Sequence, residues 1–383
     1  MSIYLDYNAS APLDPRVLEE MVEIYRNFAG NADSRTHLYG ERARSVVEEA
    51  RKQAAALLGT APEEVFFTSG STESDNIAIQ GLEAYGREQG KTHIVTTSIE
   101  HKAILETVKA MGLRGFSIDV VDPDRSGRVD ADRLLERVGE QTLLVSVMHV
   151  NNETGVIQPV RELGEELVRR GIFFHVDATQ SCGKLVEELR ALPYHMLSFS
   201  AHKLRGPQGI GGLVLRKTAG RRPPVRAILY GGQQERGLRP GTVPVALAGG
   251  CGRACELARL EYRENEAKTR AVKEALLALL EESRVTYSLN GDQRYCVSNT
   301  LNLCLHGVSS EALMIAARQN CSVSNGSACT SKSYAPSYVL TAMGIPVEQI
   351  EQSIRVSWGP DTDLAEFARE FSALLAIAKG LSL

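Results

Sequence analysis

The chain has 383 residues, of which 43% are hydrophobic and 23% are charged, proportions that are ordinary for a globular protein. Its formal net charge of −4 provides no polybasic surface, which argues against direct binding to nucleic acid or to an anionic membrane. The first residues lack a basic region followed by an apolar run, and no apolar run reaches the length of a membrane span, so we expect a soluble cytoplasmic protein. The seven cysteines are scattered without C-x-x-C spacing, which argues against a disulfide framework or a zinc site.

Helices and short apolar strands alternate through the first 215 residues. Asp14-Pro15 predicts an N-cap with proline at the first position of a helix to about Phe28, and Gly59 ends a second helix that starts near residue 40. Beyond it the sequence predicts strands at 65–68, 93–97, 115–121, 142–150 and 172–176, separated by helices at 73–85, 101–111, 130–138 and 160–170. Strands that are apolar on both faces and alternate with helices indicate an α/β fold with a mostly parallel sheet covered on each side.

The pattern changes after Arg216. A glycine-rich, polar stretch at 231–241 precedes a long helical stretch at 243–282, which is a plausible connector to a second, smaller domain. That domain mixes predicted strands and helices, at 296–305 and 354–358 and at 310–319, 336–343 and 364–379, respectively. We therefore expect a large domain at 15–255 and a smaller α+β domain formed by 1–14 and 256–383.

Lys203 is the first candidate catalytic residue. The segment Ser198–Lys203 reads as a strand that runs into a turn before Gly206-Pro207. A lysine beside His202 in a mostly apolar setting loses hydration, so its pKa should fall, and such an amine can form a Schiff base with an aldehyde. A single lysine is more often a solvated surface charge, so the interpretation of Lys203 depends on the other residues that accompany it.

Three further polar groups lie where predicted strands end or helices begin. The turn Ser69–Thr72 precedes a helix and suits a phosphate, although serine and threonine are also ordinary N-caps. Asp177 follows a strand, at the edge where ligands bind in α/β sheets, and could pair with the protonated nitrogen of a pyridine ring or simply cap. His101 could lie flat on that ring or cap its own helix.

Two residues in the second half are also candidates. Cys329 lies in a run of small polar residues that predicts an exposed loop, and an exposed cysteine near cationic groups is a reactive thiolate. Arg355 interrupts an apolar strand and needs a carboxylate partner, either a protein side chain or a substrate. The other cysteines lie in or beside apolar elements, and we interpret them as packing residues: Cys182, Cys251, Cys255, Cys296, Cys304 and Cys321.

Together these residues resemble the pyridoxal-phosphate-dependent cysteine desulfurases of the NifS/IscS type. The likeness runs from Tyr4 to the strand of Arg355, and the string Gly326-Ser327-Ala328-Cys329-Thr330-Ser331 is its most specific part. The remaining motifs occupy 67–76, 100–102, 149–155, 175–181, 198–203 and 231–242.

The resemblance implies a homodimer of the PLP-dependent transferase fold type I, with the cofactor in the large domain. Lys203 would hold pyridoxal phosphate as a Schiff base and move protons, while His101 would stack on the ring and act as acid and base. Asp177 would pair with the pyridine nitrogen, and Gln180 with the ring hydroxyl. The other implied cofactor-binding residues lie around the phosphate and near the substrate: Ser71, Thr72, Ser200, His202, Asn152 and, from the partner subunit, Thr242.

The same resemblance implies the reaction. Asn152 and Arg355 would orient the carboxylate of L-cysteine, and Cys329, on a mobile loop at about 322–334, would attack the substrate sulfur. The products would be L-alanine and a persulfide on Cys329, which is passed to an acceptor protein. No metal site is implied beyond a transient iron–sulfur ligand role for Cys329.

The acceptor and two rival functions stay open at this point. The family often has Leu-Glu-Pro-Ser after the cysteine loop, where this chain has Tyr334-Ala335-Pro336-Ser337, with Lys332 just before, and it ends at Leu383. The possible acceptors are an iron–sulfur scaffold, a tRNA thiolation pathway and a DNA phosphorothioation machinery. Because of these departures from the family pattern, we expect a dedicated partner other than the housekeeping scaffold. A selenocysteine lyase or another fold-type-I enzyme would keep Lys203 but would not need Cys329, and a non-catalytic regulator would have lost one of these residues.

Overall fold

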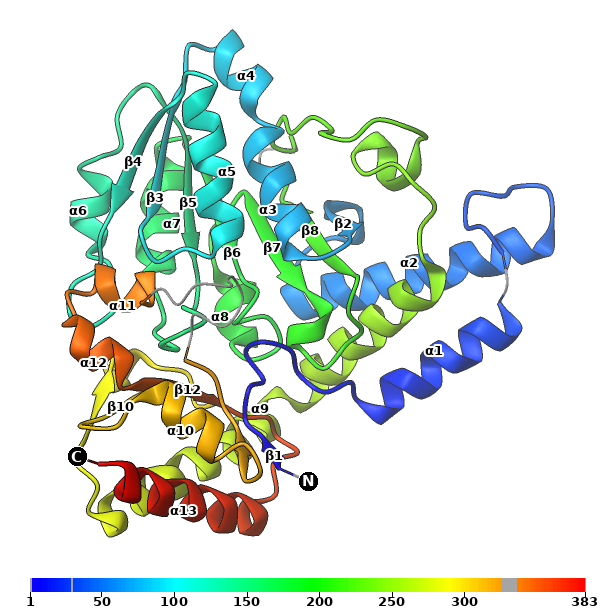
Figure 1. Ribbon diagram of the computed structural model, residues 1–383. Coiled ribbons are helices and arrows are strands. Elements are labelled where there is room, and N and C mark those ends of the chain that lie inside the picture. The colour runs from blue at the N-terminus through cyan, green and yellow to red at the C-terminus, as the bar shows by residue number, and fades with distance from the viewer. Residues whose placement is uncertain (1, 29, 219, 326–335, 383) are drawn as a thin grey trace.

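The computed structural model describes residues 2–28, 30–218, 220–325 and 336–382. Within these residues the larger body is built on a seven-stranded sheet in the order β2-β8-β7-β6-β5-β3-β4 (Figure 1). All neighbouring strands are parallel except β8, which is antiparallel to both β2 and β7, so the predicted mostly parallel sheet is confirmed. The strands are β2 (Val65–Thr68), β3 (His93–Thr97), β4 (Ser117–Val121), β5 (Thr142–Met148), β6 (Phe173–Asp177), β7 (Met196–Ser200) and β8 (Gly211–Leu215).

Helices cover both faces of this sheet. Because side chains alternate along a strand, Val65 and Phe67 of β2 pack into one apolar core while Phe66 packs into the other. The first core lies under α2 (Leu38–Leu58), α6 (Ala131–Leu135), α7 (Val160–Arg169) and α8 (Val186–Ala191), and the second under α3 (Ser71–Gln80) and α5 (Lys102–Leu113). The α/β fold predicted from two-sided apolar strands is therefore confirmed.

The first two predicted helices are confirmed, and a third is split. Helix α1 (Pro15–Asn27) is capped by Asp14, and α2 ends at Gly59, which has a left-handed φ of 66°. The helix predicted at 73–85 breaks into α3 and α4 (Glu83–Glu88) around Gly81. A Cβ on Gly81 would collide with the Ile77 carbonyl oxygen and with Val225, so the segment 222–228 can approach only a glycine there.

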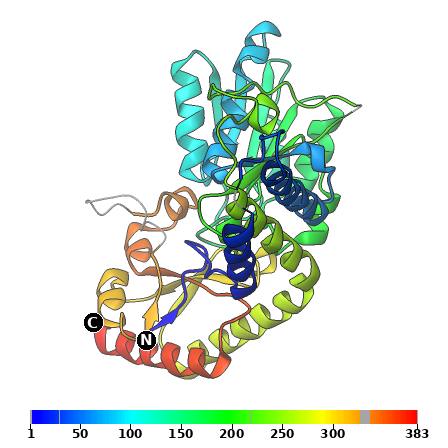
Figure 2. The same cartoon turned by 90° about the vertical axis from the view of Figure 1, so that its right-hand side faces the viewer.

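A smaller body contains both ends of the described chain (Figure 2). Its antiparallel sheet has the order β12-β10-β9, and β1 pairs with β11 beside it. The strands are β1 (Ile3–Tyr4), β9 (Tyr287–Asn290), β10 (Thr300–Leu305), β11 (Cys321–Ser322) and β12 (Ser353–Ser357), and the helices are α10 (Ser310–Ala316), α11 (Tyr338–Ala342), α12 (Val347–Glu351) and α13 (Leu364–Leu381).

One helix joins the two bodies. Helix α9 (Val245–Ser283) packs Cys251 and Cys255 into a core of the large sheet, whereas Val272 and Leu276 belong to the core of the small sheet. The predicted domain division at residue 255 falls inside this continuous helix and stays a prediction. No helix in the described ranges combines the length and apolarity needed to cross a membrane.

Candidate active site

The candidate residues meet where the parallel strands end. Strand β6 ends at Asp177, β7 leads into the 3₁₀ turn Ala201–Lys203, and the segment after β3 places His101 at the start of α5. The carboxyl edge of such a sheet is where α/β proteins bind ligands, because the strand-to-helix loops converge there. Asp177 thus lies at the carboxyl end of a strand, where the sequence places it, and the roles of these side chains stay predictions.

Lys203 reaches the N-terminal segment. Its Nζ donates hydrogen bonds to the carbonyl oxygens of Asn8 and Ala9, each at 2.6 Å. These contacts hold the amine at the junction of the two bodies, with the large sheet behind it. The lowering of its pKa that the sequence predicts stays a prediction.

Asn8 connects several candidate residues. Its carbonyl oxygen also accepts from Gln180 Nε2 at 3.0 Å, and its own Nδ2 donates to the Asn152 carbonyl oxygen at 3.1 Å. Its main-chain N–H donates to Ser357 Oγ at the end of β12. The buried Asn8 therefore ties together the lysine, the Gln180 loop and the small sheet.

Asp177 is 5% exposed and lies at the carboxyl end of a central strand. Both hydrogen bonds that it accepts fall on Oδ1, from the Thr179 main-chain N–H at 2.9 Å and from Thr179 Oγ1 at 2.5 Å. Asp177 thus has the local capping role considered from the sequence. Capping uses only Oδ1 of the carboxylate, so it is compatible with a second role for Oδ2.

Two buried acids stand near Asp177. Burial, with a smaller contribution from the charge of Asp177, raises the pKa of Glu100 to about 8 and the pKa of Asp75 well above its usual value. Glu100 is therefore mostly neutral in the folded protein at neutral pH, and burial disfavours the charged form of Asp75 as well. Glu100 Oε1 accepts from Thr97 Oγ1 and from the Met148 N–H, which fixes the segment that leads to His101.

We expect Glu100→Gln to flatten the pH dependence of stability. The folded protein keeps a proton on Glu100 that the unfolded chain releases above its ordinary pKa near 4.5, so stability falls as the pH rises toward 8. The loss from this group is at most about 1.4 kcal/mol of unfolding free energy per pH unit. Urea unfolding of the cofactor-free protein at pH 5.5, 6.5 and 7.5 should show a shallower slope in the variant.

The exposed Glu106 on α5 provides the matched control, since Glu106→Gln removes a carboxylate that is 70% exposed. Its slope should equal that of the unsubstituted protein. Equal slopes in Glu100→Gln as well would show that Glu100 ionises normally in the folded state.

His101 caps α5, as one of the two sequence interpretations predicts. Its Nδ1 accepts from the Ala103 N–H at 3.2 Å, so the neutral ring carries its proton on Nε2. Desolvation by the surrounding protein lowers its pKa, and the charge of Asp177 opposes part of that shift. The residue is nevertheless solvent-exposed, so a neutral imidazole with a protonated Nε2 remains accessible at the site.

The start of α3 forms a cradle of main-chain N–H groups. Its N-cap is Gly70, with a φ of 153° and no capping side chain, and Ser71 and Thr72 form the first turn. A Cβ on Gly70 would lie 3.5 Å from the Oγ of the buried Ser200, and one on Gly211 would lie 2.8 Å from the Gly70 Cα. Gly211 thus lets β8 approach Gly70, and Ser200 lies beside an uncapped helix N-terminus, which is suited to an anion.

His202 and Thr242 occupy different surroundings. His202 contacts Ser10 Oγ through Nδ1 at 3.3 Å, and burial together with Lys203 lowers its pKa to about 4. It therefore acts as a neutral hydrogen-bonding group. Thr242 is exposed at the end of the glycine-rich segment.

Arg355 finds its carboxylate partner within the chain. Its guanidinium donates to Asp6 Oδ1 at 2.6 Å and to the Asn152 carbonyl oxygen at 3.1 Å. Among the described residues, Arg355 Nε and Asn152 Oδ1 are buried without a hydrogen-bond partner. These two atoms are the kind of unsatisfied polar groups that a bound ligand would complete.

Cys329 lies outside the described residues, as do most of the predicted loop at 322–334 and the residues Lys332, Tyr334 and Ala335. The described residues that flank 326–335 contact the site. Ser324 exchanges main-chain hydrogen bonds with Arg355, and Ser337 Oγ donates to Glu153 Oε2 at 2.5 Å. The Tyr338 hydroxyl donates to the Glu100 carbonyl oxygen at 2.8 Å.

Sequence reasoning missed Asp6 and Asn8 as members of the site. The signal was present but short: Leu5 and Tyr7 are apolar and buried, so the polar residues alternate with them as in an extended segment. Only the tertiary contacts identify their partners.

A model of the class-V aminotransferases (Aminotran_5) matches residues 3–369 of this chain. The chain belongs to the class-V aminotransferase family. A relative from Anaeromyxobacter dehalogenans (strain 2CP-C), named cysteine desulfurase IscS, is 42% identical over 359 residues, which cover 93% of this chain and 87% of the relative. Both observations agree with the family that the sequence motifs resemble.

Solved structures of similar proteins support the assignment of this chain to the class-V aminotransferase family. A NifS-like protein matches over the whole of both chains with a TM-score of 0.90 and 35% identity. A structure described as SspA in complex with cysteine matches with a TM-score of 0.80 and 33% identity, covering 93% of this chain and 99% of that one. The predicted fold type I is thereby confirmed.

Class-V aminotransferases depend on pyridoxal phosphate, and so does this one. The residues present fit that cofactor on their own chemistry. A reachable lysine amine, a buried carboxylate at a strand end and an uncapped helix N-terminus match its aldehyde, its pyridine nitrogen and its phosphate, respectively.

Proposed function

We propose that this chain is a cysteine desulfurase that transfers the sulfur of L-cysteine to Cys329 and releases L-alanine. The observation that carries the proposal is that Lys203 and Asp177 lie at the edge of the large sheet, near Asn152, which Arg355 of β12 contacts from the smaller body. The chain is also 42% identical to a relative named cysteine desulfurase. The two bodies, divided near residue 255, would contribute the cofactor site and the cysteine-bearing segment.

Pyridoxal phosphate, when bound, supplies an electron sink that weakens the bonds at the substrate α-carbon. Lys203 would hold it covalently and carry protons at Nζ, because that atom lies at the junction where Asn8 and Ala9 meet the sheet edge. Asp177 would pair with the ring nitrogen through Oδ2, and His101 would stack and exchange a proton at Nε2. Ser71, Thr72, Ser200 and His202 would bind the phosphate around the start of α3.

The sulfur step balances without an external oxidant. The Cys329 thiolate would attack the sulfur of the substrate, forming an S–S bond as the C–S bond breaks. The electron pair of that bond stays with the carbon skeleton, which takes up a proton and leaves as alanine. The sulfur then sits on Cys329 as a persulfide, and in that form Cys329 would pass it to an acceptor protein.

Arg355→Ala is expected to weaken productive binding of L-cysteine. The guanidinium is held between Asp6 and Asn152, with Nε directed to neither, and a charge-assisted contact to a carboxylate acts before and during the reaction. We expect KM to rise more than kcat falls, with a total loss of about 2–5 kcal/mol in kcat/KM. Steady-state alanine release measures both constants.

Arg294→Ala is the control, since Arg294 is an exposed arginine of the smaller body that pairs with Asp292. Its kinetic constants should not change. An Arg355→Ala enzyme with the original kcat/KM would make Arg355 a purely structural partner of Asp6.

The function itself is tested with purified protein, L-cysteine and L-selenocysteine. A desulfurase releases alanine from L-cysteine in equal amount to the sulfur recovered as persulfide and, with a thiol present, as sulfide. Alanine formed from L-selenocysteine but not from L-cysteine would instead support the selenocysteine lyase alternative.

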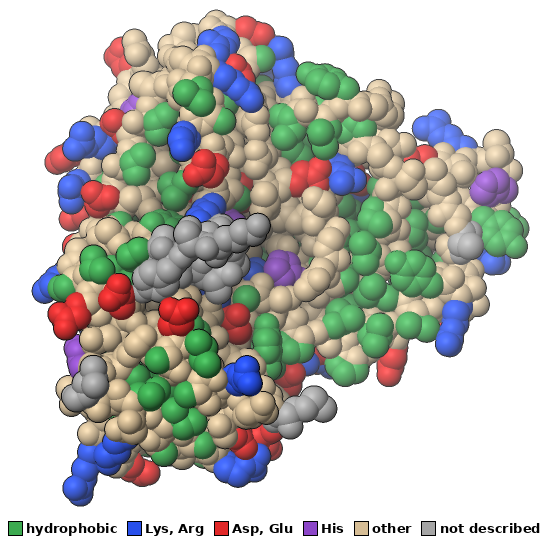
Figure 3. All heavy atoms as spheres, viewed as in Figure 1, with side chains coloured by type: hydrophobic (Ala, Val, Ile, Leu, Met, Phe, Trp, Pro, Cys, Tyr) green, Lys and Arg blue, Asp and Glu red, His purple; other side chains and the backbone are tan. Residues whose placement is uncertain are grey.

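We further propose a homodimer in which Thr242 of one chain reaches the phosphate site of the other. Support comes from apolar side chains that gather over α1 and α2 (Figure 3), where Leu18, Tyr25, Leu38 and Tyr39 are exposed. A surface of this kind on a globular protein usually marks an interaction site. Sedimentation equilibrium of the purified protein measures the state of association.

The acceptor is proposed only as a class: a protein whose receiving thiol approaches Cys329 directly. The sequence around Cys329, with Lys332 and without the glutamate common in the family, favours an acidic or polar face on that partner. A dedicated acceptor would then be preferred over an iron–sulfur scaffold, a preference that competitive transfer of labelled persulfide measures.

A further inference from the structure

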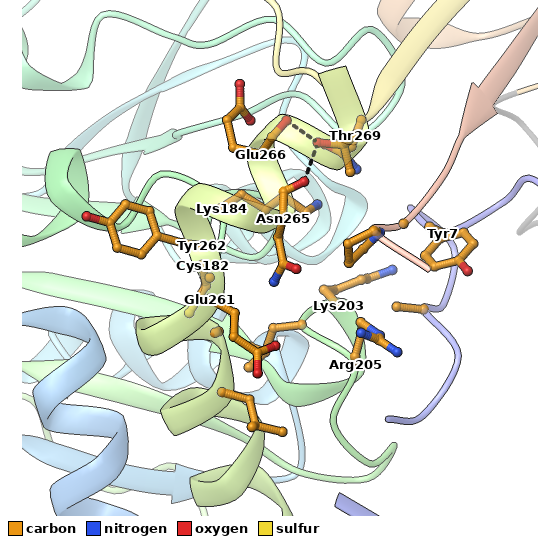
Figure 4. A pocket seen from close by; sticks show the side chains of 18 of the residues that line it. Tyr7, Cys182, Lys184, Lys203, Arg205, Glu261, Tyr262, Asn265, Glu266 and Thr269 are labelled. Carbon is orange, nitrogen blue, oxygen red and sulfur yellow. Dashed lines mark hydrogen bonds between the residues drawn. The ribbon is translucent and has the colours of Figure 1, made fainter. Parts of the chain in front are cut away.

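A cavity adjoins the candidate site behind Lys203. It has a volume of about 840 Å³, counted out to the solvent at its mouth, and it lies between the N-terminal segment, the turn after β6, and α9. Of the described candidate residues, only Lys203 lines it. In Figure 4, Lys203 and Arg205 lie across the cavity from Glu261 of α9, with Asn265 above, and Lys184 lies deeper.

Lys184 is the unusual side chain of this cavity. Its Nζ donates to Gln180 Oε1 at 3.3 Å, and no carboxylate among the described residues forms an ion pair with it. Burial, and after it the charge of Lys203, lowers the pKa of Lys184 to about 7. A lysine in this position is costly to charge, so its presence needs an explanation beyond packing.

The contact with Lys184 determines how the Gln180 amide is turned. Gln180 Nε2 donates to the Asn8 carbonyl oxygen at 3.0 Å, and that same oxygen accepts from Lys203 Nζ at 2.6 Å. The ammonium form of Lys184 can only donate, so it requires the Gln180 oxygen on its side. The Asn8 carbonyl oxygen can only accept, so it requires the Gln180 nitrogen on the other side. The amide orientation is thereby fixed at both ends, with its NH₂ group on the side of Lys203.

The carboxylates that face this cavity are occupied elsewhere. Asp14 pairs with Arg16 and Arg205, Glu261 pairs with Arg16, and Glu266 pairs with Arg270. The titratable and charged groups that line the cavity around Lys184 are Tyr7, Asp14, Cys182, Lys203, Arg205, Glu261, Tyr262 and Glu266.

We propose that Lys184 is a positioning residue for the cofactor site: it holds the Gln180 oxygen, so that the amide nitrogen faces Lys203. The inference rests on the proposed role of Lys203. Gln180, turned this way, has a remaining N–H for an acceptor on the Lys203 side, such as a ring oxygen of the cofactor.

The first experiment measures binding of pyridoxal phosphate to the cofactor-free protein by absorbance titration. Lys184→Met should weaken binding about tenfold, because the Gln180 amide then loses the donor that holds its oxygen. Lys184→Arg keeps a donor for Gln180 Oε1 and should stay within about twofold of the unsubstituted protein.

Lys273→Met is the matched control, because Lys273 is another lysine of lowered pKa, on the small-body part of α9. It should leave cofactor binding unchanged. Unchanged cofactor binding in Lys184→Met overturns the positioning role, whether or not the variant is less stable. If Lys184→Met does not fold, Lys184→Leu, which also lacks a donor, replaces it with the same expectation.

A double-mutant cycle tests whether Lys184 acts through Gln180. Lys184→Met and Gln180→Leu should each weaken pyridoxal phosphate binding about tenfold, the usual effect of losing one charge-assisted hydrogen bond. The double variant should bind no worse than Gln180→Leu alone. Additive losses would overturn the positioning role. Borohydride tagging of a lysine other than Lys203 would refute the proposed function separately.

Discussion

Lys203→Ala is expected to yield a colourless protein without desulfurase activity. The amine that would carry pyridoxal phosphate is absent, so turnover should fall on the order of 10⁴-fold or more, as for other covalent catalytic groups. The absorbance of the reconstituted protein and alanine release from L-cysteine measure the two effects. Borohydride reduction of the unsubstituted protein, followed by peptide mapping, should place the cofactor on Lys203.

The substitution also removes two hydrogen bonds to the Asn8 and Ala9 carbonyl oxygens, so folding must be checked by circular dichroism and thermal unfolding. Lys217→Ala is a suitable control, because Lys217 pairs with Glu63 at the surface of the large body. That variant should be coloured and fully active. A cofactor label on any other lysine would contradict the assignment of the whole site.

Cys329→Ser is expected to bind the cofactor and L-cysteine but to form no persulfide. The hydroxyl cannot accept sulfur, so alanine release should fall on the order of 10³-fold or more. Cys296 and Cys321 are poor replacements, because burial raises the thiol pKa to about 11 for Cys296 and about 12 for Cys321. Mass spectrometry of the intact protein after exposure to L-cysteine detects the added sulfur.

Cys296→Ser serves as the control, since this cysteine is only partly buried but does not form a thiolate readily. It should gain one sulfur atom as the unsubstituted protein does. Persulfide formation in Cys329→Ser would mean that another residue is the nucleophile or that the mechanism is different.

Local chemistry made much of the large body predictable. Asp14-Pro15 and Gly59 mark helix ends because capping depends on neighbouring residues only. Asp177 could be placed at a strand end by the apolar run before it. The position of a side chain at the carboxyl edge of the sheet then follows from the parallel arrangement.

Strand β8 was not predicted, because its glycines are explained by tertiary contacts and not by the local sequence. Gly211 and Gly212 are poor strand residues, yet a Cβ on Gly212 would collide with the Phe199 ring, and one on Gly211 would crowd Gly70. The glycines are required by close packing beside the candidate phosphate cradle. No local pattern carries that information.

The partners of Arg355 and Lys203 could not be found from periodicity either. Asp6 and Asn8 lie in a short extended segment whose role depends on residues far along the chain. No pattern in the sequence singles out Lys184. Cys329 was identified through the resemblance of its motif, and its structural surroundings stay a prediction.

The position of Asp6 and Asn8 has a consequence for the order of folding. Asp6 meets Arg355 across 349 residues of sequence, and Asn8 meets Lys203 across 195. During synthesis the large sheet can assemble while the N-terminal segment still lacks its partners on β12, which is made after all seven strands of that sheet. Such long-range closure is slow, so the nascent chain should capture its cofactor only after β12 has been made and has paired.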